Sequence, residues 1–126
     1  MASLLKVLLV DDEADITTII KNGLEKHGWH ADVFNDPKLA LSNFKPNYYD
    51  FVILDVRMPG MNGFQLAKRM WAIDERVKIC FLSAFEIYAN EATKVFTDFK
   101  DHSFVKKPIT PKELIQHIEA QITQAR

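Results

Sequence analysis

The chain has little of several features that mark particular protein classes. It contains one cysteine, Cys80, so an internal disulfide cannot form, and a reducing compartment suits it. Its 16 Lys and Arg against 17 Asp and Glu leave a net charge of −1, which gives no broad electrostatic case for binding nucleic acid or an anionic membrane. No apolar run approaches the length of a membrane span, and the start, MASLLKVLLV, is too short for a signal-peptide core. We therefore expect a cytoplasmic protein.

The sequence also lacks a Pro/Gly/Ser-rich linker, a low-complexity segment and any second pattern of elements. Its 126 residues are 48% hydrophobic and 26% charged, the composition of a folded globular protein that can bury a substantial core. We expect one domain over residues 1–126.

Short apolar runs recur along the chain at the spacing of βαβ units: KVLLV, ADVF, DFVIL, KICFL and SFV. Most are continuous rather than alternating, which is typical of strands buried on both faces of a parallel sheet. Between them lie five segments with apolar residues at helical spacing. The first three are Ile16, Ile19, Ile20 and Leu24; Leu39, Ala40 and Phe44, which follow the N-cap and first-turn proline at Asp36–Pro37; and residues 63–72. The last two are residues 86–99 and the stripe Leu114, Ile115, Ile118 and Ile122, which follows a capping pattern at Thr110 and Glu113. The order is strand then helix, five times, which predicts an α/β fold with a doubly wound parallel sheet.

Polar residues stand where these strands end. Asp11 and Asp12 follow the first strand, Asp55 closes the third, Ser83 the fourth and Lys107 the fifth. Carboxyl ends of parallel strands meet at one edge, where ligand sites of such sheets lie. Each residue could simply mark a strand end, but all of them at one edge favour a site.

Three carboxylates in one cleft repel each other unless a cation lies among them. Oxygen ligands with room for water suit Mg²⁺, or Mn²⁺ as a substitute. The four histidines, His27, His30, His102 and His117, have no zinc-ligand spacing, and we interpret each as a surface or partly buried polar residue. With the cation bound, Lys107 and the Ser83 hydroxyl would face phosphoryl oxygens, and Asp55 would remain as a nucleophile for phosphoryl transfer.

These residues resemble the response-regulator receiver domains of two-component signalling. The resemblance covers essentially the whole chain, and its most specific part is DVRMPGMNGF, Asp55 to Phe64. It implies a flavodoxin-like (βα)5 fold of five strands in the order 2-1-3-4-5. It also implies that Asp55 accepts the phosphoryl group and that Asp12 and Asp55 bind Mg²⁺ directly. Asp11 would act through water, and the Arg57 backbone carbonyl would complete the protein ligands.

The resemblance assigns further roles near the fifth strand. Lys107, which directly precedes proline, would contact the phosphoryl group, and strand alternation sends its neighbour Lys106 to the opposite face. The Lys107–Pro108 bond is expected to be cis. Ser83 and Phe104 would form the switch pair, although an aromatic in a strand is by itself more often plain core, and Phe104 lacks the hydroxyl of the frequent tyrosine.

Two positions could set the lifetime of the phosphorylated state. Arg57 and Phe85 are each two residues past a site residue, and we hypothesise that they hinder the attacking water; the equal alternative is that both face solvent or a partner. The stretch DFKDHSF lacks the glycine that many relatives carry before the fifth strand, so the exit of the fourth helix is not predicted.

The resemblance implies a phosphoacceptor switch rather than an enzyme, one that assists its own phosphorylation and dephosphorylation. Its partners would be a sensor histidine kinase or phosphotransfer protein and an effector that the sequence does not name. A phosphorylation-dependent homodimer is possible, with Lys94, Asp98, Asp101 and Lys112 on its face, although a solvated surface explains these charges as well. We expect neither nucleic-acid binding by this domain nor membrane binding.

Three alternatives share features with this interpretation. An FMN binder of the same fold would need small and hydroxyl residues where DDEAD stands, because carboxylates repel its phosphate. A phosphatase with an Asp nucleophile would carry a second acid where Arg57 stands. The third alternative, a receiver-like protein-binding module that no longer uses phosphorylation, is opposed only by the complete set of site residues.

Overall fold

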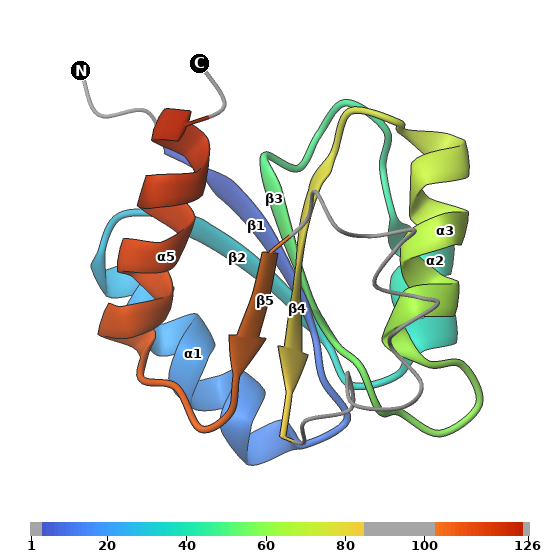
Figure 1. Ribbon diagram of the computed structural model, residues 1–126, viewed down its shortest axis with the longest axis horizontal. Helices are drawn as coiled ribbons and strands as arrows, with labels where there is room; N and C mark the ends of the chain where they lie inside the picture. Colours follow the sequence, from blue (N-terminus) through green and yellow to red (C-terminus); the bar gives the residue numbers. More distant parts are fainter. Residues whose placement is uncertain (1–3, 85–102, 125–126) are drawn as a thin grey trace.

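The computed structural model describes residues 4–84 and 103–124 of the chain. Within these ranges it contains a five-stranded sheet in the order β2-β1-β3-β4-β5, and every neighbouring pair is parallel. The strands are β1 (Lys6–Val10), β2 (His30–Phe34), β3 (Phe51–Asp55), β4 (Lys78–Ser83) and β5 (Ser103–Lys106). This topology confirms the predicted strand order. Because all strands run the same way, their carboxyl ends lie along one edge (Figure 1).

Helices cover both faces of the sheet. Figure 1 shows α1 (Ala14–Lys26) and α5 (Pro111–Gln124) on one side and α2 (Pro37–Asn43) and α3 (Gly63–Ile73) on the other. Alternate residues of β1 point to opposite sides: Val7 and Leu9 pack in the core under α1 and α5, whereas Leu8 and Val10 pack in the core under α2 and α3. Burial of such a side chain is worth roughly 1.5–3 kcal/mol. The continuous apolar runs in the sequence reflect this burial on both faces.

Three helices begin at capped positions. Asp36 precedes α2, and its side chain accepts a hydrogen bond from the Lys38 N–H (2.9 Å), with Pro37 in the first turn. Before α5, the Thr110 N–H donates to Glu113 Oε1 (2.9 Å) and the Glu113 N–H donates to Thr110 Oγ1 (3.1 Å), as the sequence predicted. A further capping box at the start of α3, between Asn62 and Gln65, was not predicted. Each cap satisfies N–H groups that the helix cannot use.

The structure corrects two helical patterns and one boundary. Ile19 and Leu39 were expected in the apolar stripes of their helices, but their side chains are 59% and 55% exposed. Each lies one position away from the residues that reach the core, Ile20 and Ala40, which are buried. The second strand begins at His30, one residue earlier than predicted. The predicted helix at 86–99 and the stretch DFKDHSF up to His102 lie outside the described residues.

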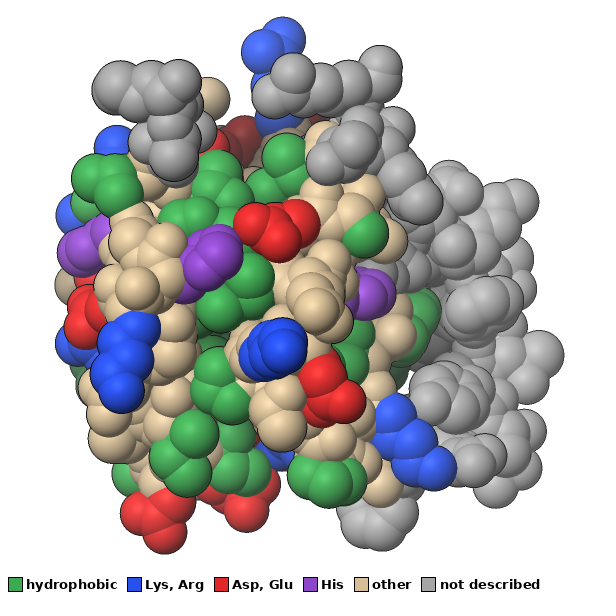
Figure 2. Space-filling view, turned by 90° about the vertical axis from the view of Figure 1, so that its left-hand side faces the viewer, with side chains coloured by type: hydrophobic (Ala, Val, Ile, Leu, Met, Phe, Trp, Pro, Cys, Tyr) green, Lys and Arg blue, Asp and Glu red, His purple; other side chains and the backbone are tan. Residues whose placement is uncertain are grey.

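The side of the molecule formed by α1 and α5 is hollowed. Figure 2, which faces this side, shows hydrophobic side chains in the seam between charged and histidine side chains. The hollow measures about 510 Å³, and Gly23, Pro111 and Ile115 contribute to its lining. At its rim His27 Nε2 lies 3.2 Å from Glu119 Oε2, which links the two helices. No helix in the described part of the chain combines the length and the apolar character that a membrane span requires.

Candidate functional site

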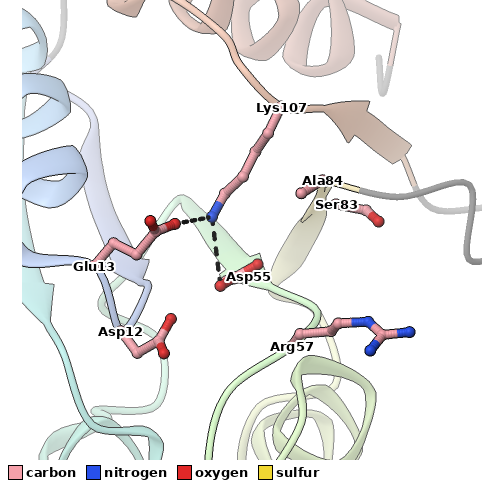
Figure 3. Close-up of a pocket in the computed structure, with 7 residues that line it drawn as sticks. All are labelled: Asp12, Glu13, Asp55, Arg57, Ser83, Ala84 and Lys107. Carbon is pink, nitrogen blue, oxygen red and sulfur yellow. Dashed lines mark hydrogen bonds and ion pairs between the residues drawn. The ribbon is translucent and has the colours of Figure 1, made fainter.

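The polar residues at the carboxyl ends of the strands meet in one pocket of about 310 Å³. The residues that line it come from four separate loops and strand ends: Asp12, Glu13, Asp55, Arg57, Ser83, Ala84 and Lys107. Figure 3 shows Asp12 and Glu13 on one side of Asp55 and Lys107 reaching down toward it from the β5 side. The sequence prediction of one shared site at this edge therefore agrees with the geometry.

Backbone hydrogen bonds that continue past the strand ends hold these loops together. The Asp11 N–H donates to the Phe34 carbonyl (3.2 Å), the Val56 N–H to the Leu82 carbonyl (2.9 Å) and the Lys107 N–H to the Ser83 carbonyl (2.8 Å). Each bond ties the first residues of one loop to the neighbouring strand. The site residues are therefore fixed by the sheet itself, which limits how far like charges can move apart.

Asp11, Asp12 and Asp55 form a group that could hold a metal ion. Each offers one carboxylate oxygen, and these oxygens lie within 4.8 Å of one another. Asp11 is fully buried and Asp55 nearly so, whereas Asp12 is exposed. A set of hard oxygen donors with one side open to water fits Mg²⁺ or Mn²⁺. The residues present thus suit the cation that the sequence predicted.

Lys107 brings a positive charge directly against the carboxylates. Its Nζ lies 2.7 Å from Asp11 Oδ2 and 3.4 Å from Asp55 Oδ2, and its side chain is only 10% exposed. Burial lowers the pKa of Lys107, but hydrogen bonding to Asp11 and the charges of Asp11 and Asp55 outweigh burial and raise this pKa overall. Lys106, by contrast, is exposed. The choice of Lys107 over Lys106 for the site agrees with this arrangement.

Asp55 is held in an environment that disfavours its charge. Burial, and next the charge of Asp11, raise its pKa to about 7; Asp12 adds to the effect, and Lys107 opposes it only in part. Without a cation, a large share of Asp55 is therefore protonated near neutral pH. A protonated carboxyl is a poor nucleophile, and further positive charge beside Asp55 would increase its ionised share.

Glu13 is a site residue that the sequence prediction missed. Its Oε1 lies 3.1 Å from Lys107 Nζ, so the lysine has three acidic neighbours. The Glu13 side chain is largely exposed, and water screens this pair. In addition, the Glu13 N–H donates to Asp11 Oδ1 (2.9 Å), which fixes that buried carboxylate. The run of three acids, Asp11 to Glu13, was the only signal in the sequence.

The switch pair assigned by resemblance lies beside the pocket. Ser83 is buried and lines it, and Figure 3 shows its side chain directed away from Asp55. Phe104 is half-buried on β5, where its ring lies 5.3 Å from that of Phe81 and 6.3 Å from that of Phe64. In this state Phe104 takes part in the core under α3. The movement of Ser83 and Phe104 stays a prediction.

The loop after Asp55 carries Arg57 and begins α3. Arg57 lines the pocket, but its side chain extends away from the carboxylates in Figure 3, and the metal role of its carbonyl stays a prediction. Phe85, its suggested partner in slowing hydrolysis, lies outside the described residues. The Lys107–Pro108 bond is cis, the isomer that the resemblance implies.

Gly60 and Gly63 explain the spacing of this loop. Gly60 has φ +85°, a conformation that glycine adopts without strain. At Gly63 a Cβ atom would lie 2.4 Å from the Asp55 carbonyl oxygen, so only glycine lets α3 begin this close to the end of β3. The Gly63 N–H donates to the Val56 carbonyl (2.9 Å). The motif therefore sets the backbone position of Asp55.

Comparison with known proteins gives a consistent result. A family model described as the response regulator receiver domain matches residues 7–119. The response regulator receiver protein CpdR of Brucella abortus is 28% identical over 95% of this chain and 98% of its own length. The probable transcriptional regulator ycf27 of Guillardia theta is 36% identical over 91% of this chain and 44% of its own length. The transcriptional regulatory protein RprY of Bacteroides fragilis is 29% identical over 97% of this chain. This chain spans about half the length of RprY, which carries further sequence.

Solved structures share the fold. A CheY-like response regulator receiver domain protein from Methanospirillum hungatei superposes with a TM-score of 0.80 at 21% identity, covering 97% of this chain and 96% of its own. The response regulator TrrA from Thermotoga maritima, determined in complex with Mg²⁺ and BeF, gives a TM-score of 0.75 at 28% identity, covering 93% of this chain and 98% of its own.

Proposed function

This chain belongs to the response regulator receiver domain family, and from that premise we propose that Asp55 accepts a phosphoryl group from a histidine kinase or phosphotransfer protein in a Mg²⁺-dependent reaction. One observation carries the proposal: carboxylate oxygens of Asp11, Asp12 and Asp55 lie within 4.8 Å of one another, and Lys107 Nζ lies 3.4 Å from Asp55 Oδ2. A purely structural cluster gains nothing from an arrangement in which burial, and next the charges of Asp11 and Asp12, raise the pKa of Asp55 to about 7.

Asp12 and Asp55 would hold the cation directly, with Asp11 acting through water and the Arg57 carbonyl as a further ligand. Bound Mg²⁺ supplies positive charge that favours ionised Asp55 and neutralises phosphoryl oxygens. Mn²⁺ would substitute. The relative TrrA was determined in complex with Mg²⁺ and BeF, which supports Mg²⁺ as the cation proposed for this chain.

The chain's own groups then position the reaction. An ionised Asp55 oxygen forms the new O–P bond while the P–N bond to the donor imidazole breaks, and the bond's electron pair leaves with the imidazole, which takes up a proton. The Lys107 ammonium, now 3.4 Å from Asp55, would pair with a phosphoryl oxygen. The Ser83 hydroxyl would turn from its present direction and donate to another oxygen. Asp55 and Lys107 already lie together before the donor arrives, which lowers the cost of ordering them, whereas Ser83 would still have to turn.

Phosphorylation would act as a switch on binding. It adds about one and a half to two negative charges to the pocket. Movement of Ser83 and Phe104 around this charge would shift an existing equilibrium of the partner-binding face. The chain would therefore be a phosphoacceptor rather than an enzyme with a separate substrate, and it would act in the cytoplasm. An effector or a second copy of the chain would bind its phosphorylated form. The names of RprY and ycf27 describe transcriptional regulators, and such an output is a proposal for this chain.

Incubation with a small phosphodonor and Mg²⁺, followed by intact mass, tests the function. The wild type should gain the mass of one phosphoryl group, and the gain should disappear in EDTA and in Asp55→Asn. Asp50→Asn, which changes an exposed acid just before β3, is the matched control and should label as the wild type does. An unchanged wild-type mass would favour the protein-binding module that no longer uses phosphorylation. Labelling that survives in Asp55→Asn would contradict the choice of acceptor.

A further inference from the structure

The side chain of Asn35 contacts the loop that carries Asp11 and Asp12, although Asn35 does not line the pocket around Asp55. Asn35 follows β2, and its amide nitrogen donates two hydrogen bonds to residues that come after β1. Nδ2 donates to the Asp11 carbonyl oxygen (2.8 Å) and to Thr17 Oγ1 (3.0 Å). The Asp11 N–H donates in turn to the Phe34 carbonyl (3.2 Å). The backbone of Asp11 is thus held on both its N–H and its carbonyl by the end of β2.

We propose that Asn35 is a positioning residue for the cation-binding carboxylates, an inference that rests on the proposed function. The carbonyl that Asn35 holds belongs to the peptide unit between Asp11 and Asp12. Because a peptide unit is planar, fixing this carbonyl fixes the direction in which the chain enters Asp12. Asp12 is exposed, and within residues 4–84 and 103–124 its carboxylate has no hydrogen-bond or ion-pair partner, so the backbone sets its direction. Asp12 and Asn35 also line one hollow of about 400 Å³.

The chemistry of the contact requires an amide. The Asp11 carbonyl oxygen can only accept, so its partner must donate. The Thr17 hydroxyl donates to the Ala14 carbonyl (3.0 Å), which leaves its oxygen free to accept from Asn35. An amide nitrogen has the two hydrogens that these two acceptors need. A carboxylate at position 35 would have neither and would bring a further negative charge toward Asp12.

The hydrogen bond to Thr17 restricts the movement of the Asn35 side chain. Thr17 is buried in the first turns of α1, so Asn35 is braced against a helix rather than against a free loop. Holding a metal ligand in direction through a hydrogen-bonded neighbour is typically worth 10- to 100-fold in metal affinity. If Asn35 only connected the two loops, its removal would lower the stability of the fold and leave the affinity for the cation unchanged.

Titration calorimetry with Mg²⁺ separates these roles. Asn35→Ala should weaken Mg²⁺ binding by about tenfold relative to the wild type. The matched control is Asn43→Ala, which also removes an asparagine whose Nδ2 donates to a backbone carbonyl, that of Leu39 (2.8 Å), but at the far end of α2. It should bind Mg²⁺ as the wild type does. Thermal unfolding in EDTA gives the stability cost of both changes.

Thr17→Val is the second variant, in case Asn35→Ala does not fold. It removes one of the two acceptors at nearly constant volume and should weaken Mg²⁺ binding less, by about threefold. Wild-type affinity in Asn35→Ala, or in Thr17→Val if that is the variant that folds, would overturn the inference while leaving the proposed function in place. Equal weakening in Asn35→Ala and Asn43→Ala would overturn it too. Absence of Mg²⁺ binding to the wild type would overturn the proposed function itself.

Discussion

Asp55 shows how one residue links folding to function. Its burial and the nearby Asp11 raise its pKa to about 7, and it lines the pocket in which we propose that a cation and a phosphoryl group bind. Asp11 itself is fully buried, with Lys107 against one of its oxygens and the Glu13 N–H on the other. Lys107 neutralises only part of the negative charge of these carboxylates, and a divalent cation would neutralise the rest.

The pKa of Asp55 predicts a pH-dependent cost to stability in EDTA. In the unfolded chain Asp titrates near its ordinary value of about 3.9, whereas in the folded chain the pKa of Asp55 is about 7. Between these values the folded state binds the proton more tightly, so the Asp55 contribution to the free energy of unfolding is greatest below about pH 4 and falls as the pH rises to about 7. Asp55→Asn removes this loss. Urea unfolding should show Asp55→Asn gaining a few kcal/mol over the wild type at pH 8, at about 1.4 kcal/mol per pKa unit, and much less at pH 5.

The opposite dependence, with the gain from Asp55→Asn larger at pH 5 than at pH 8, would contradict the account of this carboxyl. An equal gain at both values would show that the substitution acts through packing and not through charge.

Lys107 is predicted to stabilise the fold through Asp11. Lys107→Met keeps the apolar stem but leaves a buried carboxylate without its cation, and should lower the free energy of unfolding in EDTA by about 3 kcal/mol. Lys106→Met, one residue away and exposed, is the control and should change it by less than about 0.5 kcal/mol. Mg²⁺ should restore part of the loss in Lys107→Met. Equal effects of the two substitutions would rule out a special role for the buried ammonium.

At the scale of elements, the sequence predicted those features that depend on local patterns. The strands ending at Val10, Asp55 and Ser83 are continuous apolar runs that stop at a polar residue, and parallel pairing brings such ends together. The cap at Asp36 and the capping box at Thr110 also depend on neighbours in sequence. These features were predicted because their physical cause lies within a few residues.

Individual side-chain contacts between distant segments, apart from the shared site at the sheet edge, were not predicted. Asn35 contacts Thr17 across 18 positions, and Glu13 contacts Lys107 across 94, so neither pair leaves a pattern in the sequence. Ile19 and Leu39 match the helical period, but they lie just outside the faces of α1 and α2 that pack against the sheet, and their side chains are exposed. Helical periodicity gives the apolar side of a helix, and only packing decides which residue at its border is covered.

The start of α3 carries a prediction at this scale. Alanine is the better helix former by about 1 kcal/mol, so Gly63→Ala would stabilise the chain if helix propensity decided. In this fold the new Cβ would overlap the Asp55 carbonyl oxygen, and α3 must move away from β3. We expect thermal unfolding to show a destabilisation of about 1–3 kcal/mol, with slower labelling of Asp55 by a small phosphodonor. A Gly63→Ala protein more stable than the wild type would contradict this geometry, because it would show that a Cβ atom fits beside the Asp55 carbonyl oxygen.

For the whole molecule, the sheet has two roles. Its interior strands bury apolar residues on both faces and supply most of the stability, whereas its carboxyl edge gathers acids that the fold tolerates at a cost. The parallel sheet followed from the continuous apolar runs of the sequence, and its strand order followed from the family resemblance. A cation bound at this edge by the folded chain alone would couple its binding to the stability of the entire fold.

The central claim is that Asp11, Asp12 and Asp55 tolerate their crowding because they bind a divalent cation together. Its most direct test is thermal unfolding of the wild type, Asp12→Asn and Asp55→Asn with increasing Mg²⁺. A ligand that binds only the folded state adds about 2.7 kcal/mol at 100 times its dissociation constant. We expect the midpoint of the wild type to rise with Mg²⁺ while those of Asp12→Asn and Asp55→Asn rise much less. A wild-type midpoint that does not respond to Mg²⁺, or an equal rise in all three proteins, would contradict the claim.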